Sequence, residues 1–195
     1  MSVNLSKGQK VNLSKGNEGL SKIIVGLGWD EVKKKGGLFS RAPKAIDCDA
    51  SAVLLSNQRL IDNKDVVYFK NLIHSSGAVA HTGDNITGAG ENDDEQIRVD
   101  LTQIPSEYDS LVIFVNIYQA VERKQHFGMI DNAFIRVVDA RNDKELCRYN
   151  LTDDYSDMTA VLFGELYLQD GEWQFNAMGQ GTQDAHLGQV IQRYC

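Results

Sequence analysis

The sequence predicts an all-β fold, a β-sandwich of two packed sheets with few short helices. Apolar and polar residues alternate over 96–101 and 172–177, which is the period of a half-buried strand. Short β-branched or aromatic runs recur along the chain, and turn-forming residues separate most of them. Two packed sheets would bury the apolar faces that a single sheet leaves exposed.

The N-terminal segment repeats itself. The tetrapeptide Leu5-Ser-Lys-Gly8 returns as Leu13-Ser-Lys-Gly16. Two copies are too few for a solenoid, in which each repeat needs stacked neighbours. We therefore expect an edge strand and a turn, either paired or doubled back.

The main strands follow from residue 22 onward. They are expected at 22–25, 52–55, 66–69, 96–101, 111–118, 133–138, 159–168 and 172–177. Residue pairs that favour turns lie between many of them. These pairs are Gly36-Gly37, Asp62-Asn63, Ser76-Gly77, Asn142-Asp143 and Asp170-Gly171. Many short strands at fairly regular spacing are typical of a sandwich.

Helix is expected only near residues 119–127 and at the C-terminus. The polar segment 119–127 fits an irregular loop or a short helix. The segment 184–194 fits an amphipathic helix with Asp184 as its N-cap. Its apolar face would consist of Leu187, Val190, Ile191 and Tyr194.

Length and composition favour one domain over residues 1–195. The chain has 195 residues, 42% of them hydrophobic, which is enough for a sizeable core. A net charge of −7 argues against a general nucleic-acid binder, whose phosphate contacts need a basic face. No apolar run reaches the length of a transmembrane segment or follows a basic start as in a signal peptide.

The cysteines favour a location in the reducing cytoplasm. Cys48, Cys147 and Cys195 are odd in number, widely scattered and form no CxxC pair. Structural zinc sites usually have paired ligands, so this spacing gives zinc no support. Free thiols, buried or exposed, are the expected state.

A basic insertion is expected at about 32–44. It carries three consecutive lysines, Lys33 to Lys35, together with Arg41 and Lys44, and it contains Gly36, Gly37 and Pro43. A solvated loop explains this composition. A docking patch for an acidic partner or a membrane surface explains it as well.

The segment 81–96 carries the strongest functional signal. It holds five carboxylates and no Lys or Arg. Those carboxylates are Asp84, Glu91, Asp93, Asp94 and Glu95. Three glycines would let backbone carbonyls turn inward, and Asn85, Thr87 and Asn92 add neutral oxygens. Hard oxygen donors on a bent loop suit Ca²⁺, which accepts flexible coordination. The alternative is a solvated acidic loop.

The spacing of this loop does not match an EF-hand. Counted from Asp84, the sixth residue is Ala89, where the motif needs glycine. Ile86 and Gly88 stand at alternate positions and offer no side-chain oxygen. Both flanks of the loop are expected to be strands rather than helices. A calcium site would therefore combine this loop with oxygens from elsewhere in the chain.

Acidic and amide side chains at other strand ends could supply those oxygens. Asp30 ends one expected strand, Asp47 and Asp49 open another, and Asn71 follows a third. Strand ends converge at one end of a sandwich, and so much negative charge would suit two ions better than one. The candidate ligands are Asp30, Asp47, Asp49, Asn71, Asp84, Asn85, Thr87, Gly90, Asp93, Asp94 and Glu95.

Several motifs in combination resemble those of a known family. They are Val25-Gly-Leu-Gly-Trp-Asp30, Asp47-Cys-Asp-Ala-Ser-Ala52, Asp65-Val-Val-Tyr-Phe69, Ser76-Gly-Ala-Val79, Gly83-Asp-Asn-Ile-Thr-Gly-Ala-Gly90, Asp93-Asp-Glu-Gln96, Asn132-Ala-Phe-Ile-Arg136 and Trp173-Gln-Phe-Asn-Ala177. Together they span nearly the whole chain. The combination resembles the TerD-domain family of bacterial tellurium-resistance and general-stress proteins.

The resemblance implies a β-sandwich that binds calcium, with no demonstrated catalytic reaction. It also implies association with other proteins of a Ter stress system, including membrane-embedded partners. Peripheral association of a cytoplasmic protein with the inner membrane would follow from such partners.

Two other functions remain open from the residues alone. Clustered carboxylates could hold two metals for a phosphoesterase reaction, with His81 beside the loop as a base. A small-ligand module, for example for cyclic nucleotides, is the other alternative. However, no glycine-rich loop enters a helix and no arginine is placed for a phosphate. The preferred expectation is therefore a non-enzymatic, calcium-binding stress module.

Overall fold

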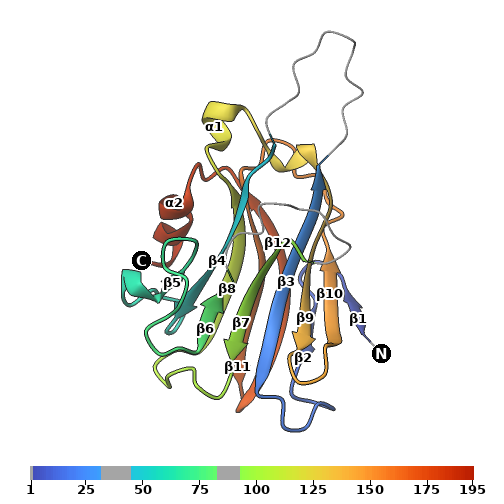
Figure 1. Ribbon diagram of the computed structural model, residues 1–195, viewed down its shortest axis with the longest axis vertical. Helices are drawn as coiled ribbons and strands as arrows, with labels where there is room; N and C mark the ends of the chain where they lie inside the picture. The colour runs from blue at the N-terminus through green and yellow to red at the C-terminus, as the bar shows by residue number, and fades with distance from the viewer. Residues whose placement is uncertain (1, 32–44, 83–92) are drawn as a thin grey trace.

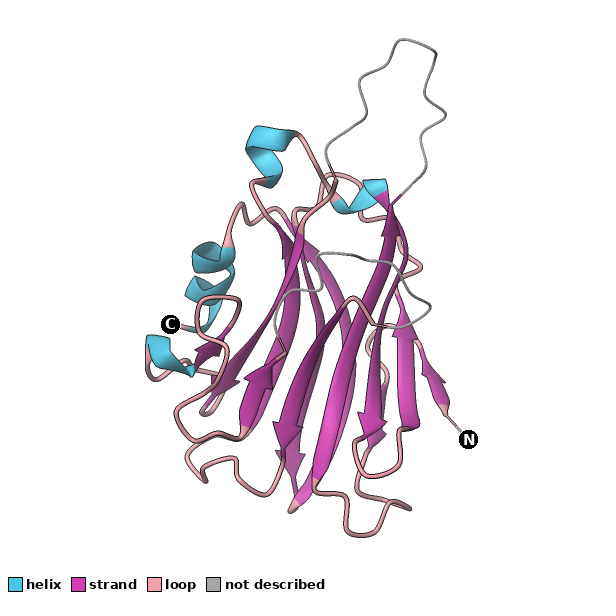
Figure 2. Ribbon diagram, viewed as in Figure 1, coloured by secondary structure: helices cyan, strands magenta, loops and turns pink. Residues whose placement is uncertain are grey.

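The computed structural model describes residues 2–31, 45–82 and 93–195, which form two six-stranded sheets. The first sheet has the order β1-β10-β9-β3-β7-β6, and the second has the order β2-β12-β11-β8-β4-β5. Figure 2 shows the strands as two layers, with the short helices at one end and along one side. The predicted all-β sandwich is confirmed.

The strands of the first sheet are β1 (Val3–Leu5), β3 (Lys22–Glu31), β6 (Val79–His81), β7 (Glu95–Asp100), β9 (Ile130–Asp139) and β10 (Lys144–Asn150). Those of the second are β2 (Lys10–Asn12), β4 (Cys48–Leu55), β5 (Val66–Val67), β8 (Ser110–Ile117), β11 (Ala160–Gln169) and β12 (Glu172–Thr182). Most neighbours are antiparallel, whereas β1 pairs with β10 in parallel. No described helix is long and apolar enough to cross a lipid bilayer.

Short strands that lead into the two copies of the N-terminal repeat provide one edge strand for each sheet. β1 pairs with β10 and β2 pairs with β12, so these two strands do not pair with each other. The first residue of each copy, Leu5 or Leu13, is buried in the core between the sheets. Gly8 and Gly16 follow with positive φ angles of 76° and 78°, a backbone conformation that favours glycine. The chain therefore doubles back across the edge of the sandwich.

Two hydrophobic clusters form the core, one between the sheets and one beneath the C-terminal helix. The larger one fills the space between the sheets and includes Ile23, Val25 and Leu27 of β3. The smaller one lies on the outer face of the second sheet, where α2 (Leu187–Ile191) packs. Its buried members are Val53, Leu55, Val66, Val112, Phe114, Ala160, Leu162 and Val190. The apolar face of the C-terminal helix was thus predicted correctly.

The expected start of that helix was wrong. The helix begins at Leu187, and its N-cap residue, His186, makes no side-chain capping bond. Asp184 instead accepts hydrogen bonds at Oδ2 from Thr182 Oγ1 at 2.8 Å and from Arg193 Nε at 2.9 Å. Asp184 therefore binds Arg193 and lies outside the helix instead of capping it. α1 (Ala120–Arg123) confirms a short helix within 119–127.

The strand expected at 66–69 is shorter than predicted. β5 ends at Val67, and the chain then turns back, with Tyr68 N donating to Asn71 O at 3.0 Å. The side-chain amide of Asn71 donates to the carbonyls of Val66 at 2.7 Å and Lys64 at 3.2 Å. These bonds close a tight turn where the sequence suggested two more strand residues.

Two glycines of β3 allow side chains to cover the outer face of the first sheet. Val25 and Leu27 point into the core, so Gly26 and Gly28 face outward, because side chains alternate along a strand. A Cβ atom at Gly26 would collide with the carboxylate of Asp93, and one at Gly28 would collide with the ring of Phe134. Gly26 in the motif 25–30 thus lets the Asp93 side chain lie directly against the backbone of β3.

Substitution Gly26→Ala should displace Asp93 and lower the free energy of unfolding by about 1–3 kcal/mol, the usual effect of overpacking. Urea denaturation measures the change. The double variant Gly26→Ala/Asp93→Ala should lose less stability than the sum of the single variants, because the second change removes the colliding group. Strictly additive losses would show that the two residues do not compete for this space.

Candidate functional site

One end of the sandwich brings together several of the expected ligands. Figure 1 shows β3 and β4 reaching this end, where α1 also lies. The antiparallel register pairs Leu27 of β3 with Glu95 of β7. Asp93 and Asp94, just before β7, therefore lie beside Trp29 and Asp30 at the end of β3. The expected convergence of these strand ends is confirmed for Asp30 and the segment 93–95.

Asp93 forms a bidentate ion pair with Arg136 of β9. Its two carboxylate oxygens lie 2.6 Å from Arg136 Nε and 3.0 Å from Nη2, and Gln96 Nε2 donates to it at 3.0 Å. Asp93 is 8% exposed. The hydrogen bonds from Arg136 raise the pKa of that guanidinium, against the opposing effect of burial. The charge of Asp93 is thus neutralised within the sheet.

Asp94 has no such cationic partner among the residues that the structure describes. Its Oδ2 accepts a hydrogen bond from Trp29 N at 2.7 Å, and its own N–H donates to Leu27 O at 2.7 Å. Burial raises the pKa of the Asp94 carboxyl, the Trp29 N–H partly offsets that rise, and the negative charges of Asp30 and Asp93 add to it. Asp94 is therefore held as a buried carboxylate among like charges, an arrangement that favours a bound proton or cation.

Asp30 and Asp94 each have a carboxylate oxygen that could bind a cation. Its Oδ2 accepts from Asn132 Nδ2 at 2.8 Å, and Asp131 lies opposite it on β9. Among the described residues, no hydrogen bond reaches Oδ1 of Asp30 or Oδ1 of Asp94. Two carboxylate oxygens with hard-donor chemistry thus remain at the end of β3 and the start of β7.

Glu95 braces the two sheets against each other. Its side chain points inward from β7, where Oε2 accepts a short hydrogen bond from the backbone N–H of Ala50 on β4. His81 Nε2 lies 3.7 Å from the same oxygen, and Glu95 is only 3% exposed. This oxygen therefore joins the sheets. The ring of His81, which the sequence offered as a base, is buried against Glu95.

The remaining described candidates lie in other surroundings. Asp47 Oδ2 is 3.5 Å from Arg123 Nη1 of α1. Asp49 projects from β4 on the outer side of the second sheet, where it lines a pocket. Asn71 closes the turn after β5. Within residues 2–31, 45–82 and 93–195, no three His, Cys, Asp or Glu side chains are grouped so that they could hold a metal.

Four candidate ligands, Asp84, Asn85, Thr87 and Gly90, lie outside the described residues, as does the basic insertion at 32–44. Their expected roles stay predictions. The described carboxylates alone do not complete a metal site, and whether the loop supplies further ligands is not tested by the described residues.

The cysteines are free thiols. Cys48 and Cys147 are buried and Cys195 is exposed. Burial raises the pKa of the Cys147 thiol to about 12. Because the thiolate is the reactive form, Cys147 is expected to be chemically inert.

Sequence reasoning missed the role of Arg136. The residue stands in the otherwise largely apolar strand 133–138, and a lone arginine there is a signal for a buried acidic partner. The inter-sheet bond from the Ala50 backbone to Glu95 had no comparable signal, because any residue type provides a backbone N–H.

Comparisons with known proteins agree over the full length of the chain. A family model described as the TerD domain matches residues 1–194. The stress response protein SCP2 of Bacillus subtilis (strain 168) is 50% identical, with 100% of both chains covered. The tellurium resistance protein TerD of Serratia marcescens is 47% identical over 93% of this chain and 91% of that protein.

A solved structure shares the fold. The homologue of telluride resistance protein (TerD) from Streptomyces coelicolor A3(2) superposes with a TM-score of 0.64, covering 85% of this chain and 92% of that one. The two sequences are 21% identical, so this likeness supports the fold alone.

The raised pKa of Asp94 predicts a pH dependence of the metal-free protein. Protonated Asp94 favours the folded state, so its contribution is fully present below the unfolded carboxyl pKa of about 4 and is lost as pH rises through the folded pKa. The variant Asp94→Asn keeps an acceptor for Trp29 N–H and removes the charge. In a chelator at neutral pH it should therefore melt roughly 2–4 °C above wild type.

Calorimetric melting from pH 4 to 8 measures this difference, which should shrink toward the acid end. Asp143→Asn, in the β9–β10 turn, is the matched control and should melt like wild type at every pH. A neutral-pH melting temperature of Asp94→Asn below that of wild type would contradict the assigned repulsion.

Proposed function

The chain belongs to the TerD domain family, and on that basis we propose that it is a calcium-binding stress-response protein. In this proposal it acts in tellurium resistance through protein partners rather than through catalysis. Similarity over 93–100% of the chain to proteins named for stress response and for tellurium resistance supports the biological setting. The single observation that supports metal binding is the buried Asp94 carboxylate next to Asp30, with no cationic partner among the described residues.

The residues at this end of the sandwich fit calcium in charge and in donor type. Asp94 and Asp30 each retain a carboxylate oxygen without a described hydrogen bond. Calcium binds carboxylate, carbonyl and amide oxygens, all of which the adjoining segment 83–92 also contains. Asp30 and Asp94 would hold the ion from the sandwich, with Asp84, Asn85, Thr87 and Gly90 as the expected loop ligands. A bound calcium ion would supply positive charge that offsets the repulsion among these carboxylates.

Asp93 and Glu95 would act as positioning residues. Arg136 anchors Asp93, and the Ala50 N–H anchors Glu95, so the backbone on both sides of Asp94 is fixed. Because the backbone around Asp94 is already ordered, calcium binding would cost little free energy for ordering it. Asp30 and Asp94 are the two described candidate ligands here with an available oxygen, which suits one ion. The second ion expected from the sequence would need ligands mainly from 83–92.

In this proposal calcium binding changes the charge and shape of the protein surface, and no reaction is catalysed. Calcium would tie an acidic loop to the end of the sandwich and reduce the local negative charge, which alters what this end can contact. The partners proposed from the family resemblance are other Ter-system proteins, including a membrane-embedded one. The protein would then work in the cytoplasm, at the inner membrane when such a partner is present.

Calcium should bind metal-free protein with clear preference over magnesium, because magnesium demands strict octahedral geometry. Binding should raise the melting temperature by linkage, since the unfolded chain scatters the ligands. At a free calcium concentration about a hundred times the dissociation constant, the stabilisation should be about 2.7 kcal/mol. Isothermal calorimetry counts the ions and calorimetric melting measures the shift.

The variants Asp94→Asn and Asp84→Ala should each lose most of the calcium-dependent shift, whereas Asp143→Asn should retain it. The first variant tests the described end of the sandwich and the second tests the loop. No binding heat for calcium, or equal affinity for the two ions, would rule out the proposal.

A further inference from the structure

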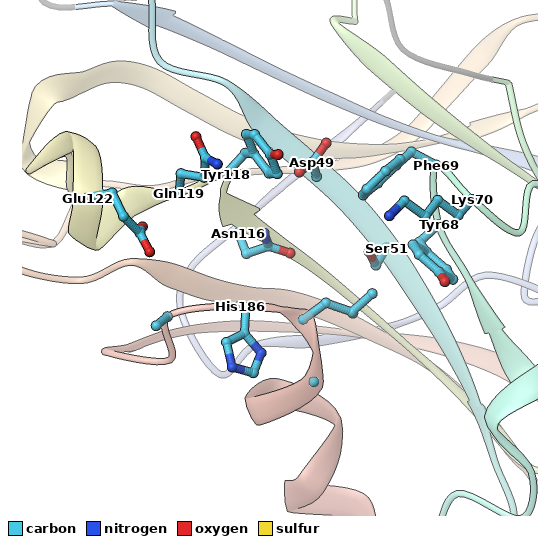
Figure 3. Close-up of a pocket in the computed structure, with 13 residues that line it drawn as sticks. Asp49, Ser51, Tyr68, Phe69, Lys70, Asn116, Tyr118, Gln119, Glu122 and His186 are labelled. Carbon is cyan, nitrogen blue, oxygen red and sulfur yellow. The ribbon is translucent and has the colours of Figure 1, made fainter.

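A pocket on the outer face of the second sheet lies apart from the proposed calcium ligands Asp30 and Asp94. It has a volume of about 360 Å³, within the range of small-molecule sites. Its walls come from the turn after β5, from α1 and the residues before it, and from the segment that enters α2 (Figure 3). Side chains of β4 and β8 form its floor. The proposed calcium function makes no use of this pocket.

The floor of the pocket is polar. Ser51 of β4 is 1% exposed and Asn116 of β8 is 6% exposed, and both line the pocket. Neither side chain has a hydrogen-bond partner among the residues that the structure describes. The same outer face is apolar further along these strands, at Val53 and Phe114, where α2 covers it. Their polar atoms are not among the enclosed, unpaired ones, so they open into the pocket, where a polar ligand or water can bond to them.

The walls combine carboxylates with aromatic rings. Asp49 borders the floor and Glu122 comes from α1, while Tyr68, Phe69 and Tyr118 supply rings (Figure 3). Phe69 and Tyr118 are each 41% exposed, so their rings are accessible to a ligand. Carboxylates together with the faces of aromatic rings attract ammonium groups through ionic and cation–π interactions.

The protein's own cations already show this preference. The ammonium of Lys70 lies 5.3 Å from the centre of the Phe69 ring, and the guanidinium of Arg123 lies 5.0 Å from that of Tyr118. Lys70 also lines the pocket, on a long and flexible side chain. It would therefore compete with a cationic ligand and would have to move aside when one binds.

We propose that this pocket binds a small organic molecule that carries an ammonium group on an aromatic or apolar body. The ammonium group would donate to the Asp49 carboxylate, to the Ser51 hydroxyl and to the side-chain oxygen of Asn116. The body would lie against Phe69 and Tyr118. Glu122 adds negative charge on the opposite wall.

Tyramine is a suitable probe, with two matched analogues that share its ring. Tyrosol carries a hydroxyl group in place of the amine, and 4-hydroxyphenylacetate carries a carboxylate. Titration of isotope-labelled protein, followed by NMR of the backbone amides and of the Asn116 side-chain amide, locates and measures binding. Tyramine should shift the signals of Ser51, Asn116 and Tyr118, whereas tyrosol should bind roughly tenfold more weakly.

Variants test the assigned roles without removing core side chains. Asp49→Asn and Glu122→Gln should each weaken tyramine binding, with the larger loss, roughly tenfold, for Asp49→Asn. Lys70→Met should strengthen binding, because it removes the competing cation. Asp170→Asn, in the β11–β12 turn at the other end of β11, is the matched control. Asp94→Asn should leave tyramine binding unchanged, which separates this site from the proposed calcium site.

Equal binding of tyramine and tyrosol, or stronger binding of the carboxylate analogue, would overturn the ammonium assignment. Tyramine shifts that leave Ser51 and Asn116 unaffected would overturn the location. The amide spectra of the free variants should match that of wild type outside the pocket, so that a lost interaction is not confused with a lost fold.

Discussion

The ion pair between Asp93 and Arg136 fixes the end of the sandwich on which the site depends. The carboxylate lies over Gly26, where a side chain would displace it, and two hydrogen bonds from the guanidinium hold it there. A nearly buried carboxylate without that partner would be strongly destabilising, because its desolvation would be uncompensated. The pair therefore fixes Asp93, the first described residue after the acidic segment, against the inner strands β3 and β9 of the first sheet. Glu95, two residues later, is anchored to the second sheet through the Ala50 N–H.

Because of these two contacts, the three consecutive acidic residues Asp93, Asp94 and Glu95 have different roles. The charge of Asp93 is neutralised by Arg136, and Glu95 of the first sheet is hydrogen-bonded to Ala50 of the second. Asp94 stands between them, held by the Trp29 N–H and facing the charge of Asp30, with a raised pKa and no cation among the described residues. A run of carboxylates that looks uniform in the sequence thus contains two structural members and one that is available to a ligand. Asp47 is likewise paired with Arg123, and Asn71 is bound to a backbone carbonyl, so both have structural contacts of their own.

Much of the fold could be predicted from the sequence because alternation and turn residues act locally. The periodic runs at 96–101 and 172–177 became β7 and β12, and the Asp170-Gly171 pair became a hairpin turn with positive φ at both residues. The errors came from side chains that bind distant partners. Asp184 is held by Arg193 rather than capping the helix, and Asn71 closes a turn that shortens β5. For the candidate site, the sequence identified the acidic segment and Asp30. It could not separate Asp93 and Glu95 from Asp94, because that distinction depends on Arg136 and Ala50, which lie far away in the chain.

The central claim is that Asp94 is a calcium ligand whose charge the folded protein otherwise disfavours. Proton release on calcium binding tests it most directly, since a metal ion displaces a proton from a ligand with a raised pKa. Calorimetric titrations in buffers of different ionisation enthalpy, at pH values just above the ordinary carboxyl range, measure the number of protons released. The account predicts release in wild type that fades toward pH 8 and is absent in Asp94→Asn. Calcium binding with the same proton release in Asp94→Asn, or with none in wild type at any pH, would contradict it.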